Sequence, residues 1–253
     1  MNIIALIPAR AGSKRIAGKN FRHLAGNPLW LYTLSAAKES GIFDGIYVSS
    51  DNEDIVYMCR LFHGVEGVLR PAEYATDISP DIEWIDHFFS VYKCVQNDPD
   101  TKTNVMPDAF AILRPTSPFR SAETIRRAWA EFQEKQPCDS IRGVQKAREN
   151  PHKMWTLYDN SLCPIILRDM TYKAFGVPSH SAPSQITNHY YIQNASLEIS
   201  WTRNVTERGS ISGDVIKPFF TDGYEGFDLN TEDDFILAEA LIEGGLATLP
   251  EVK

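Results

Sequence analysis

Apolar residues along the chain fall into short continuous runs that alternate with longer stretches of helical period. The short runs are bounded by polar and turn residues and predict buried strands at 3–7, 46–48, 65–69, 110–113 and 140–144. The longer stretches predict helices at 28–40, 53–62, 81–96, 122–136 and about 231–243. Alternating strands and helices predict a doubly wound α/β fold, in which helices cover both faces of a mainly parallel sheet.

The first and last of these helices show residues that are typical of helix ends. In the first, Asn27 is the expected N-cap, Pro28 the first helical residue and Gly41 the stop. The side chains expected to point inward from it are Leu31, Leu34 and Ala37. The last helix is expected to end at Gly244 and Gly245 and to bury Phe235, Leu237, Ala238 and Leu241.

The periodic pattern weakens over residues 145–217. Several prolines fall there, together with a polar stretch at 179–185. A structureless loop of this length is rare in a compact domain, so we predict a small subdomain inserted into a single principal domain that spans 1–253.

Composition and charge exclude several classes of protein. Apolar runs stay far below the ~20 residues of a membrane helix, and the opening segment is predicted to be a strand rather than a signal peptide. The 4 cysteines lack metal or disulfide spacing, which favours a reducing cytoplasm. The net charge of -8 argues against a nucleic-acid partner.

The charge is distributed unevenly along the sequence. Residues 1–50 hold six basic and two acidic side chains, whereas residues 221–253 hold nine acidic side chains and one lysine. The amino-terminal part is therefore suited to a polyanion and the carboxyl-terminal part to a cation.

A basic loop follows the first strand at 7–20 (IPARAGSKRIAGKN). Ligands of doubly wound folds bind at the carboxyl ends of strands, and four cations within ten residues repel one another unless an anion shares the site. The loop lacks the dinucleotide motif G-x-G-x-x-G, and its Gly12 to Gly18 spacing is one residue too long for a P-loop. We therefore predict a phosphate-binding loop of another kind.

This loop resembles the signature of the cytidylyltransferases that activate sialic acids and related nine-carbon ulosonic acids as CMP-sugars. Three further blocks resemble the same family in the same order: 69–75 (LRPAEYA), 114–120 (RPTSPFR) and 226–234 (GFDLNTEDD). The resemblance implies a Rossmann-like nucleotidyltransferase fold whose insertion binds the sugar and contacts a second subunit in a homodimer. It also implies a reaction in which the anomeric hydroxyl of an acid sugar attacks the α-phosphorus of CTP and pyrophosphate leaves, with Mg²⁺ as cofactor.

The family's nucleotide-binding residues correspond to positions in the first two blocks and just after them. Arg10 and Lys19 match residues that hold the triphosphate, and Asn20 matches a position near the ribose and phosphates. Arg70 matches the arginine that approaches the cytosine; its alternative is a structural ion pair with Glu73 or Asp77. The remaining expected nucleotide contacts are Ala11, Gly12, Ser13, Lys14, Ser79 and Asp81, the last of which stands where family members can have serine.

The expected sugar contacts lie in the third block and the insertion. Arg114 occupies a position that is often glutamine in the family, so an arginine indicates a different acid sugar or an ion pair with its carboxylate. The other expected sugar contacts are Thr116, Ser117, Gln185, Gln193 and Asn194. A family Arg–Gln pair appears here as Ser184 and Gln185, which leaves the identity of the sugar open.

Asp228 and Asn230 are the expected ligands of Mg²⁺, and Asp228 joins Arg10 and Lys19 as an expected catalytic residue. Residues two apart on an extended segment face the same side, and Mg²⁺ prefers oxygen ligands. Many family members have a second aspartate where this chain has Asn230. The acidic run at 232–234 is interpreted as favouring the positive end of the last helix.

Two alternatives remain open at this stage. One is a cytidylyltransferase for an eight-carbon ulosonic acid, or another sugar nucleotidyltransferase; the other is a nucleotide-binding protein without activity. For the leading hypothesis the product serves a surface glycan such as lipopolysaccharide or a capsule.

Overall fold

A computed structural model describes residues 1–12, 16, 18–96, 106–166, 178–181, 183 and 189–252. The chain forms two compact units. The first comprises Met1–Gly143 and Asn194–Lys253, and the second comprises Val144–Gln193. The candidate site residues that can be placed in the structure lie almost entirely in the first unit.

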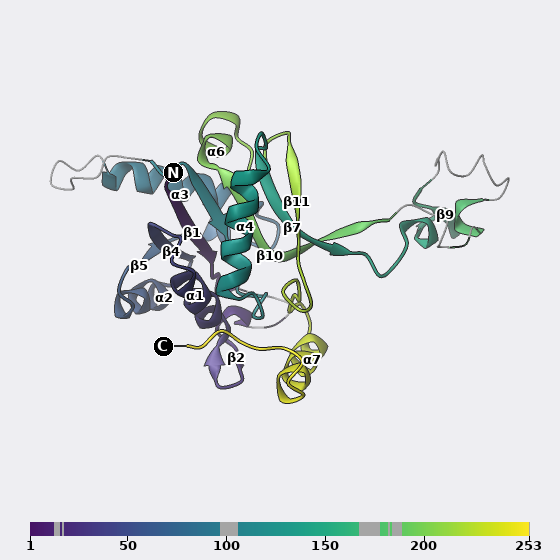
Figure 1. Ribbon diagram of the computed structural model, residues 1–253, viewed down its shortest axis with the longest axis horizontal. Coiled ribbons are helices and arrows are strands. Elements are labelled where there is room, and N and C mark those ends of the chain that lie inside the picture. The colour runs from purple at the N-terminus through teal and green to yellow at the C-terminus, as the bar shows by residue number, and fades with distance from the viewer. Residues whose placement is uncertain are drawn as a thin grey trace. The chain divides into compact units, whose positions relative to one another are not determined.

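A seven-stranded sheet with the order β11-β7-β10-β6-β1-β4-β5 forms the centre of the first unit (Figure 1). Its strands are β1 (Ile3–Pro8), β4 (Gly45–Ser50), β5 (Val65–Leu69), β6 (Ala109–Ile112), β7 (Ser140–Lys146), β10 (Tyr191–Trp201) and β11 (Ile216–Phe220). β1 runs parallel to β4 and β6, and β4 runs parallel to β5. β10 is antiparallel to β6. The predicted doubly wound, mainly parallel fold is confirmed.

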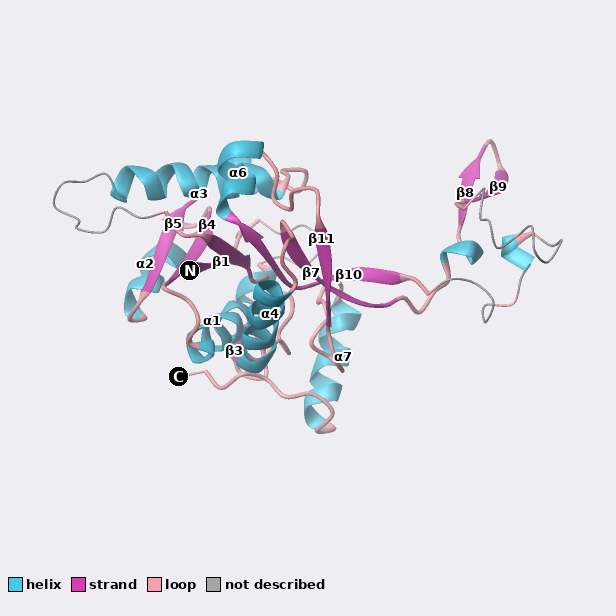
Figure 2. Ribbon diagram, turned by 45° about the horizontal axis from the view of Figure 1, so that its top comes forward, coloured by secondary structure: helices cyan, strands magenta, loops and turns pink. Residues whose placement is uncertain are grey.

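Helices pack on both faces of this sheet (Figure 2). They are α1 (Leu29–Ser40), α2 (Glu53–Met58), α3 (Asp81–Gln96), α4 (Ala122–Glu134) and α6 (Thr202–Arg208). The last helix, α7 (Glu232–Glu243), packs against α1 instead of the sheet. Strand β1 shows why both faces are covered, because its side chains alternate between two cores. Ile3, Ala5 and Ile7 pack in one core with residues of α1, α2 and α4, whereas Ile4 and Leu6 pack in another with residues of α3 and α6.

The predicted start of α1 is wrong. Asn27 does not cap the helix but lies in a short strand, β3 (Asn27–Pro28), which pairs with β2 (His23–Leu24). Pro28 is the N-cap, with an extended ψ of 137° and no side-chain cap. The predicted stop is confirmed, because Gly41 has a φ of 66°, which favours glycine.

The last helix, α7, begins as its sequence indicates. Thr231 is the N-cap and forms a capping box with Asp234. Phe235, Ala238 and Leu241 are buried. Leu237 is 50% exposed, which corrects its predicted burial: positions 235, 238 and 241 form the stripe that packs inward, and 237 lies outside it.

The second unit contains the hairpin of β8 (Trp155–Tyr158) and β9 (Ser161–Pro164). Short 3₁₀ turns occur at Pro151–Lys153 and Ser179–Ser181. This unit is shorter than the insertion at 145–217 predicted from the sequence, because 194–217 contains most of β10 and all of α6, which belong to the first unit. Within the described parts of the chain, no helix is long and apolar enough to cross a membrane.

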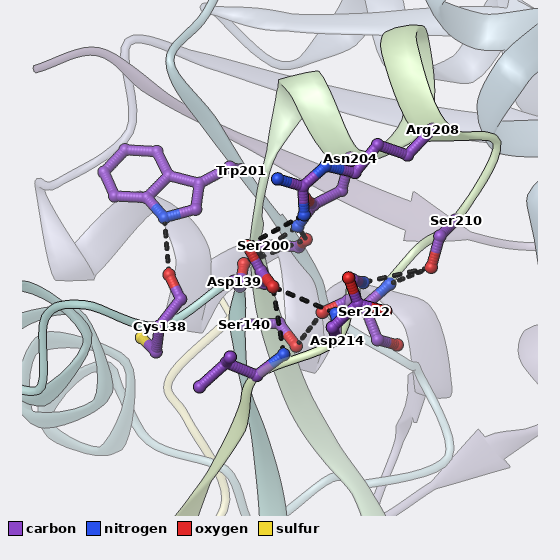
Figure 3. A network of polar contacts seen from close by, with 12 residues as sticks. Cys138, Asp139, Ser140, Ser200, Trp201, Asn204, Arg208, Ser210, Ser212 and Asp214 are labelled. Atoms are coloured by element: carbon purple, nitrogen blue, oxygen red, sulfur yellow. Dashed lines mark hydrogen bonds and ion pairs between the residues drawn. The ribbon is translucent and has the colours of Figure 1, made fainter.

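Asp139 organises the edge of the sheet where β7 begins (Figure 3). Its Oδ2 accepts hydrogen bonds from the backbone N–H groups of Asp214 and Val215, both at 2.9 Å, and its Oδ1 accepts one from Arg208 at 3.1 Å. A Cβ at Gly213 would lie 2.4 Å from the Asp139 Cβ, so a glycine is required there. The N–H of Trp201, at the end of β10, donates to the Asp139 carbonyl, and Trp201 is opposite Ala109, the first residue of β6. The network therefore lies at the edge of the sheet where β6 begins.

Candidate active site

Two predicted nucleotide-binding residues, Arg10 and Arg70, and the predicted sugar contact Arg114 lie at the opposite edge, where the parallel strands end. Arg10 follows β1, Arg70 follows β5, and Arg114 lies two residues beyond β6. Because β1, β4, β5 and β6 are parallel, their carboxyl ends meet at one edge of the sheet. We call this the carboxyl edge.

The loop after β1 is tied to its neighbours at both ends. The N–H of Ala11 donates to Asp51 Oδ1 at 2.7 Å, and Asn20 Nδ2 donates to the Arg10 carbonyl at 2.9 Å. The Arg10 guanidinium donates to the carbonyl of Thr76 at 2.7 Å and to Asp77 Oδ1 at 2.8 Å. The predicted contacts Ser13 and Lys14 lie outside the described residues, and Gly12 is exposed.

Lys19 brings the basic loop to the acidic carboxyl-terminal segment. Its Nζ donates to the Leu229 carbonyl at 2.7 Å and lies 3.4 Å from Asn230 Oδ1. The N–H of Leu229 in turn donates to the Thr116 carbonyl at 2.9 Å. The first, third and fourth sequence blocks therefore meet at one place.

Asp228 and Asn230, the predicted Mg²⁺ ligands, lie side by side on this segment. Asn230 Nδ2 donates to Asp228 Oδ2 at 2.6 Å, whereas Asp228 Oδ1 is buried without a hydrogen-bond partner among the described residues. A buried carboxylate oxygen without a partner is costly unless a ligand satisfies it. The described residues contain no cluster of three His, Cys, Asp or Glu side chains that could hold a metal. An unpartnered carboxylate oxygen of this kind can be satisfied by a cation that takes its other ligands from phosphates and water.

Asp234 has a structural role, as predicted for the acidic run. Its Oδ2 accepts hydrogen bonds from the N–H groups of Asn230 and Thr231, both at 2.7 Å. Burial raises the pKa of Asp234, but these hydrogen bonds outweigh it and the pKa is lowered. The ionised side chain thus fixes the backbone of the segment that carries Asp228.

Arg70 is buried at the end of β5. Its guanidinium lies 4.7 Å over the Trp84 ring, and its Nε donates to Ser49 Oγ at 3.1 Å. Burial lowers the pKa of Arg70 to about 10. Its hydrogen-bond partners are Ser49 atoms rather than Glu73 or Asp77, and its Nη1 has no partner among the described residues. One donor edge of Arg70 is thus available to a ligand.

Ser79 lies just after Thr76 and Asp77, the residues that accept hydrogen bonds from Arg10. Its hydroxyl donates to the Glu73 carbonyl at 2.8 Å and accepts from the N–H of Thr76 at 3.2 Å. Ser79 therefore shapes the turn before α3, and Asp81 is the first residue of that helix.

Charged side chains alternate across the carboxyl edge from α3 to β10 and β7. Asp81 Oδ1 accepts from Trp84 Nε1 at 2.7 Å, and Asp81 Oδ2 accepts from Arg114 Nη2 at 2.6 Å. The same Arg114 nitrogen lies 3.0 Å from Glu198 Oε1, and Glu198 Oε2 lies 3.2 Å from Arg142. Burial raises the pKa of Asp81, but Arg114 outweighs it, so the pKa is lowered and the carboxylate stays ionised. For Arg114 itself, burial lowers the pKa, and the two carboxylates overcome this and raise it.

Arg120, which is 1% exposed, holds the third sequence block in place from the protein interior. Its guanidinium donates to the carbonyls of Arg114 and Ser196 and, at 2.8 Å, to Thr33 Oγ1. Burial lowers the pKa of Arg120 to about 9. Ser117, a predicted sugar contact, is buried, and its hydroxyl has no partner among the described residues.

The remaining predicted sugar contacts are only partly placed. Asn194 belongs to the first unit, where its Nδ2 donates to Thr221 Oγ1 at 2.9 Å. Gln193 is exposed and belongs to the second unit. Gln185 lies outside the described residues.

Sequence reasoning missed three residues of this edge: Arg120, Glu198 and Arg142. Glu198 and Arg142 are charged residues inside strands of the central sheet, and a charged residue within a strand was the available signal. Arg120 closes the third block, but a sequence pattern does not show that its side chain turns inward.

The fold and the carboxyl edge define the class: a doubly wound α/β protein with cationic and anionic groups gathered at a ligand-binding edge. The chain belongs to the cytidylyltransferase family, whose sequence model matches residues 4–162. It is therefore a nucleotidyltransferase, and the resemblance seen in the four sequence blocks is confirmed.

Known relatives agree with this assignment. The chain is 31% identical to CMP-N,N'-diacetyllegionaminic acid synthase of Legionella pneumophila subsp. pneumophila, over 96% of this chain and 97% of that protein. It is 29% identical to an N-acylneuraminate cytidylyltransferase of Streptococcus agalactiae serotype III, over 93% of this chain and 52% of that protein, so it spans about half the length of the latter. A solved structure of CMP:2-keto-3-deoxy-manno-octonic acid synthetase with CTP has the same fold, with a TM-score of 0.65, 10% identity, and coverage of 97% of this chain and 100% of that chain.

Proposed function

We propose that this enzyme transfers CMP from CTP to the anomeric hydroxyl of a sialic-acid-like nonulosonic acid. The observation that carries the proposal is the meeting of Lys19 with the 228–230 segment at the carboxyl edge. The names of the relatives from Legionella and Streptococcus support a nine-carbon acid sugar as the acceptor.

In the proposed reaction the anomeric oxygen forms a bond to the α-phosphorus of CTP. The bond between that phosphorus and the bridging oxygen breaks, pyrophosphate leaves, and the hydroxyl proton passes to solvent. Transfers of this kind depend mainly on positioning and on charge stabilisation. Arg10 and Lys19 would hold the triphosphate, and the open donor edge of Arg70 would contact the base.

Asp228 and Asn230 would hold the proposed Mg²⁺. Bound there, the ion would neutralise charge on the phosphate oxygens. The support is the buried Asp228 oxygen without a partner among the described residues, next to the amide group of Asn230. Lys19 of the basic loop contacts the same segment, so this lysine and the metal would act on one triphosphate.

We also propose that the enzyme works as a homodimer. The hairpin of the second unit exposes apolar side chains: Leu157 is 68% exposed, Tyr158 75% and Leu162 66%. Leu157 and Leu162 are opposite each other in the hairpin and share a face. A second copy of the chain is the proposed cover for this face.

The proposed setting is the cytoplasm, with the product used for a surface glycan such as lipopolysaccharide or a capsule. Cys59, Cys138 and Cys163 are free, which supports a reducing compartment.

The test is pyrophosphate release by the purified protein with Mg²⁺. CTP, UTP, ATP and GTP are each combined with nine-carbon and eight-carbon ulosonic acids and with sugar 1-phosphates. Release with CTP and a nine-carbon acid supports the proposal. Release only with an eight-carbon acid or a sugar phosphate would show that this compound is the acceptor in place of a nine-carbon acid. CTP binding with no release would support a nucleotide-binding protein without activity.

A further inference from the structure

The carboxyl edge contains one arginine that two carboxylates share. Arg114 Nη2 is 2.6 Å from Asp81 Oδ2 and 3.0 Å from Glu198 Oε1. The Asp81 carboxylate is fixed further by the Trp84 indole, and Glu198 by Arg142. A single nitrogen of Arg114 thus joins the start of α3 to the middle of the sheet.

The backbone of Arg114 is fixed as well as its side chain. Its carbonyl accepts a hydrogen bond from Arg120 Nη1 at 3.2 Å, and Arg120 is buried and also bound to α1 and β10. Arg114 is therefore held in place by the protein itself, with its guanidinium paired to two carboxyl groups.

We propose that Arg114 is a positioning residue, which fixes Asp81 and Glu198 on either side of the site, rather than the receptor for the carboxylate of the acid sugar. This inference rests on the proposed function. The reason is electrostatic: a guanidinium that already serves two carboxylates gains little from a third anion.

Removing Arg114 would leave two carboxylates facing each other, because both lie within 3.0 Å of the same missing nitrogen. Their repulsion would move Asp81 on the nucleotide side as well as Glu198. In Arg114→Gln, kcat/KM should therefore fall about tenfold or more for CTP and for the acid sugar alike, since a tenfold change corresponds to ~1.4 kcal/mol.

Neutralising Glu198 should relieve this repulsion. In Arg114→Gln/Glu198→Gln, the amide introduced at position 198 can donate to Asp81 and accept from Arg142. We therefore expect kcat/KM for both substrates to return to within about threefold of the wild type. Arg208→Gln is the matched control: it removes an arginine bonded to Asp139 at the opposite edge and should leave both KM values unchanged.

The decisive comparison is steady-state pyrophosphate release by wild type, single variant and double variant, with each substrate varied in turn. If Arg114 binds the sugar carboxylate instead, Arg114→Gln raises KM for the acid sugar alone, and the double variant shows no recovery; that result overturns the proposal.

Should the single variant not fold, the double variant decides between the two roles. A KM for the sugar close to that of the wild type supports positioning, and a tenfold rise in this KM overturns it. A wild type that releases no pyrophosphate counts against the proposed function, and recovery of the melting temperature in the double variant then tests the charge bridge by itself.

Discussion

At the scale of single residues, Lys19 has the most direct connection to the proposed chemistry. It joins segments 210 residues apart in the sequence and lies where the triphosphate is proposed to bind. The loss of a charged hydrogen bond costs ~1.5–3 kcal/mol, so Lys19→Ala should raise KM for CTP about tenfold to a hundredfold. Initial rates against CTP concentration test this, with Lys38→Ala on the exposed end of α1 as the control. Full turnover at low CTP would contradict the assignment of the loop.

The metal proposal also belongs to single residues. Asp228→Ala should abolish most activity, because it removes Oδ1, the buried carboxylate oxygen that has no hydrogen-bond partner among the described residues. Asn230→Asp adds a negative charge and should lower the Mg²⁺ concentration needed for half-maximal rate. Asp233→Asn removes a charge from the same acidic run at an exposed position and is the control. Identical Mg²⁺ titrations for all three variants would place the cation elsewhere.

At the scale of elements, the Asp139 network binds β7, α6 and the segment before β11 into one edge. Hydrogen bonds from the N–H groups of Val215 and Asp214 lower the pKa of Asp139, and Arg208 adds to this. A lowered folded-state pKa stabilises the fold above the ordinary aspartate pKa of about 3.9, and this contribution is lost as the pH falls through the folded-state value.

Asp139→Asn should therefore lower the free energy of unfolding by about 1.5–3 kcal/mol at pH 7, the usual cost of losing a charged hydrogen bond. The difference from the wild type should shrink as the pH falls below about 4, because Asp139 of the unfolded chain takes up a proton there, and it should vanish once the pH has passed the lower folded-state pKa. Urea unfolding of the variant and the wild type, at pH 7 and at a pH below about 4, measures this difference in the free energy of unfolding. A difference that stays constant with pH would show that the charge of Asp139 does not contribute.

At the scale of the whole molecule, the carboxyl-terminal segment completes the first unit. Phe235, Ala238 and Leu241 of α7 share a core with Leu24 and Tyr32 from the amino-terminal part. Arg22 reinforces this packing, since its guanidinium lies 4.0 Å over the Phe235 ring. The basic and the acidic ends of the sequence are therefore brought together by packing as well as by charge.

The proposed dimer is a property of the whole molecule too. Leu157→Ser/Leu162→Ser should convert a dimer into a monomer, because it removes an exposed apolar pair from the hairpin. The melting point of the isolated subunit should change little, since surface substitutions of this kind have small effects. Sedimentation equilibrium measures the mass, and Ile236→Ser, at a 66% exposed position of α7, is the control. A wild-type monomer, or a dimer that survives the double substitution, would contradict the proposal.

The sequence by itself determined the alternation of strands and helices and the four blocks that identify the family. Both are local signals: buried strands are continuous apolar runs, and phosphate-binding loops need particular residues in a fixed order. It could not place Asn27, because a proline that looks like a helix start can also end a short strand. Leu237 was equally undetermined, because its helix has apolar residues beyond its buried face.

Only the tertiary structure decided which polar and charged groups meet. Lys19 with Leu229, and Arg114 with Asp81 and Glu198, are pairs that no spacing in the sequence indicates. Their contacts depend on strand order, since β10 enters the sheet beside β6 and places Glu198 opposite Ile112. Coulomb interactions act over a few ångströms in space regardless of separation along the chain, so the site arises only when the sheet is complete.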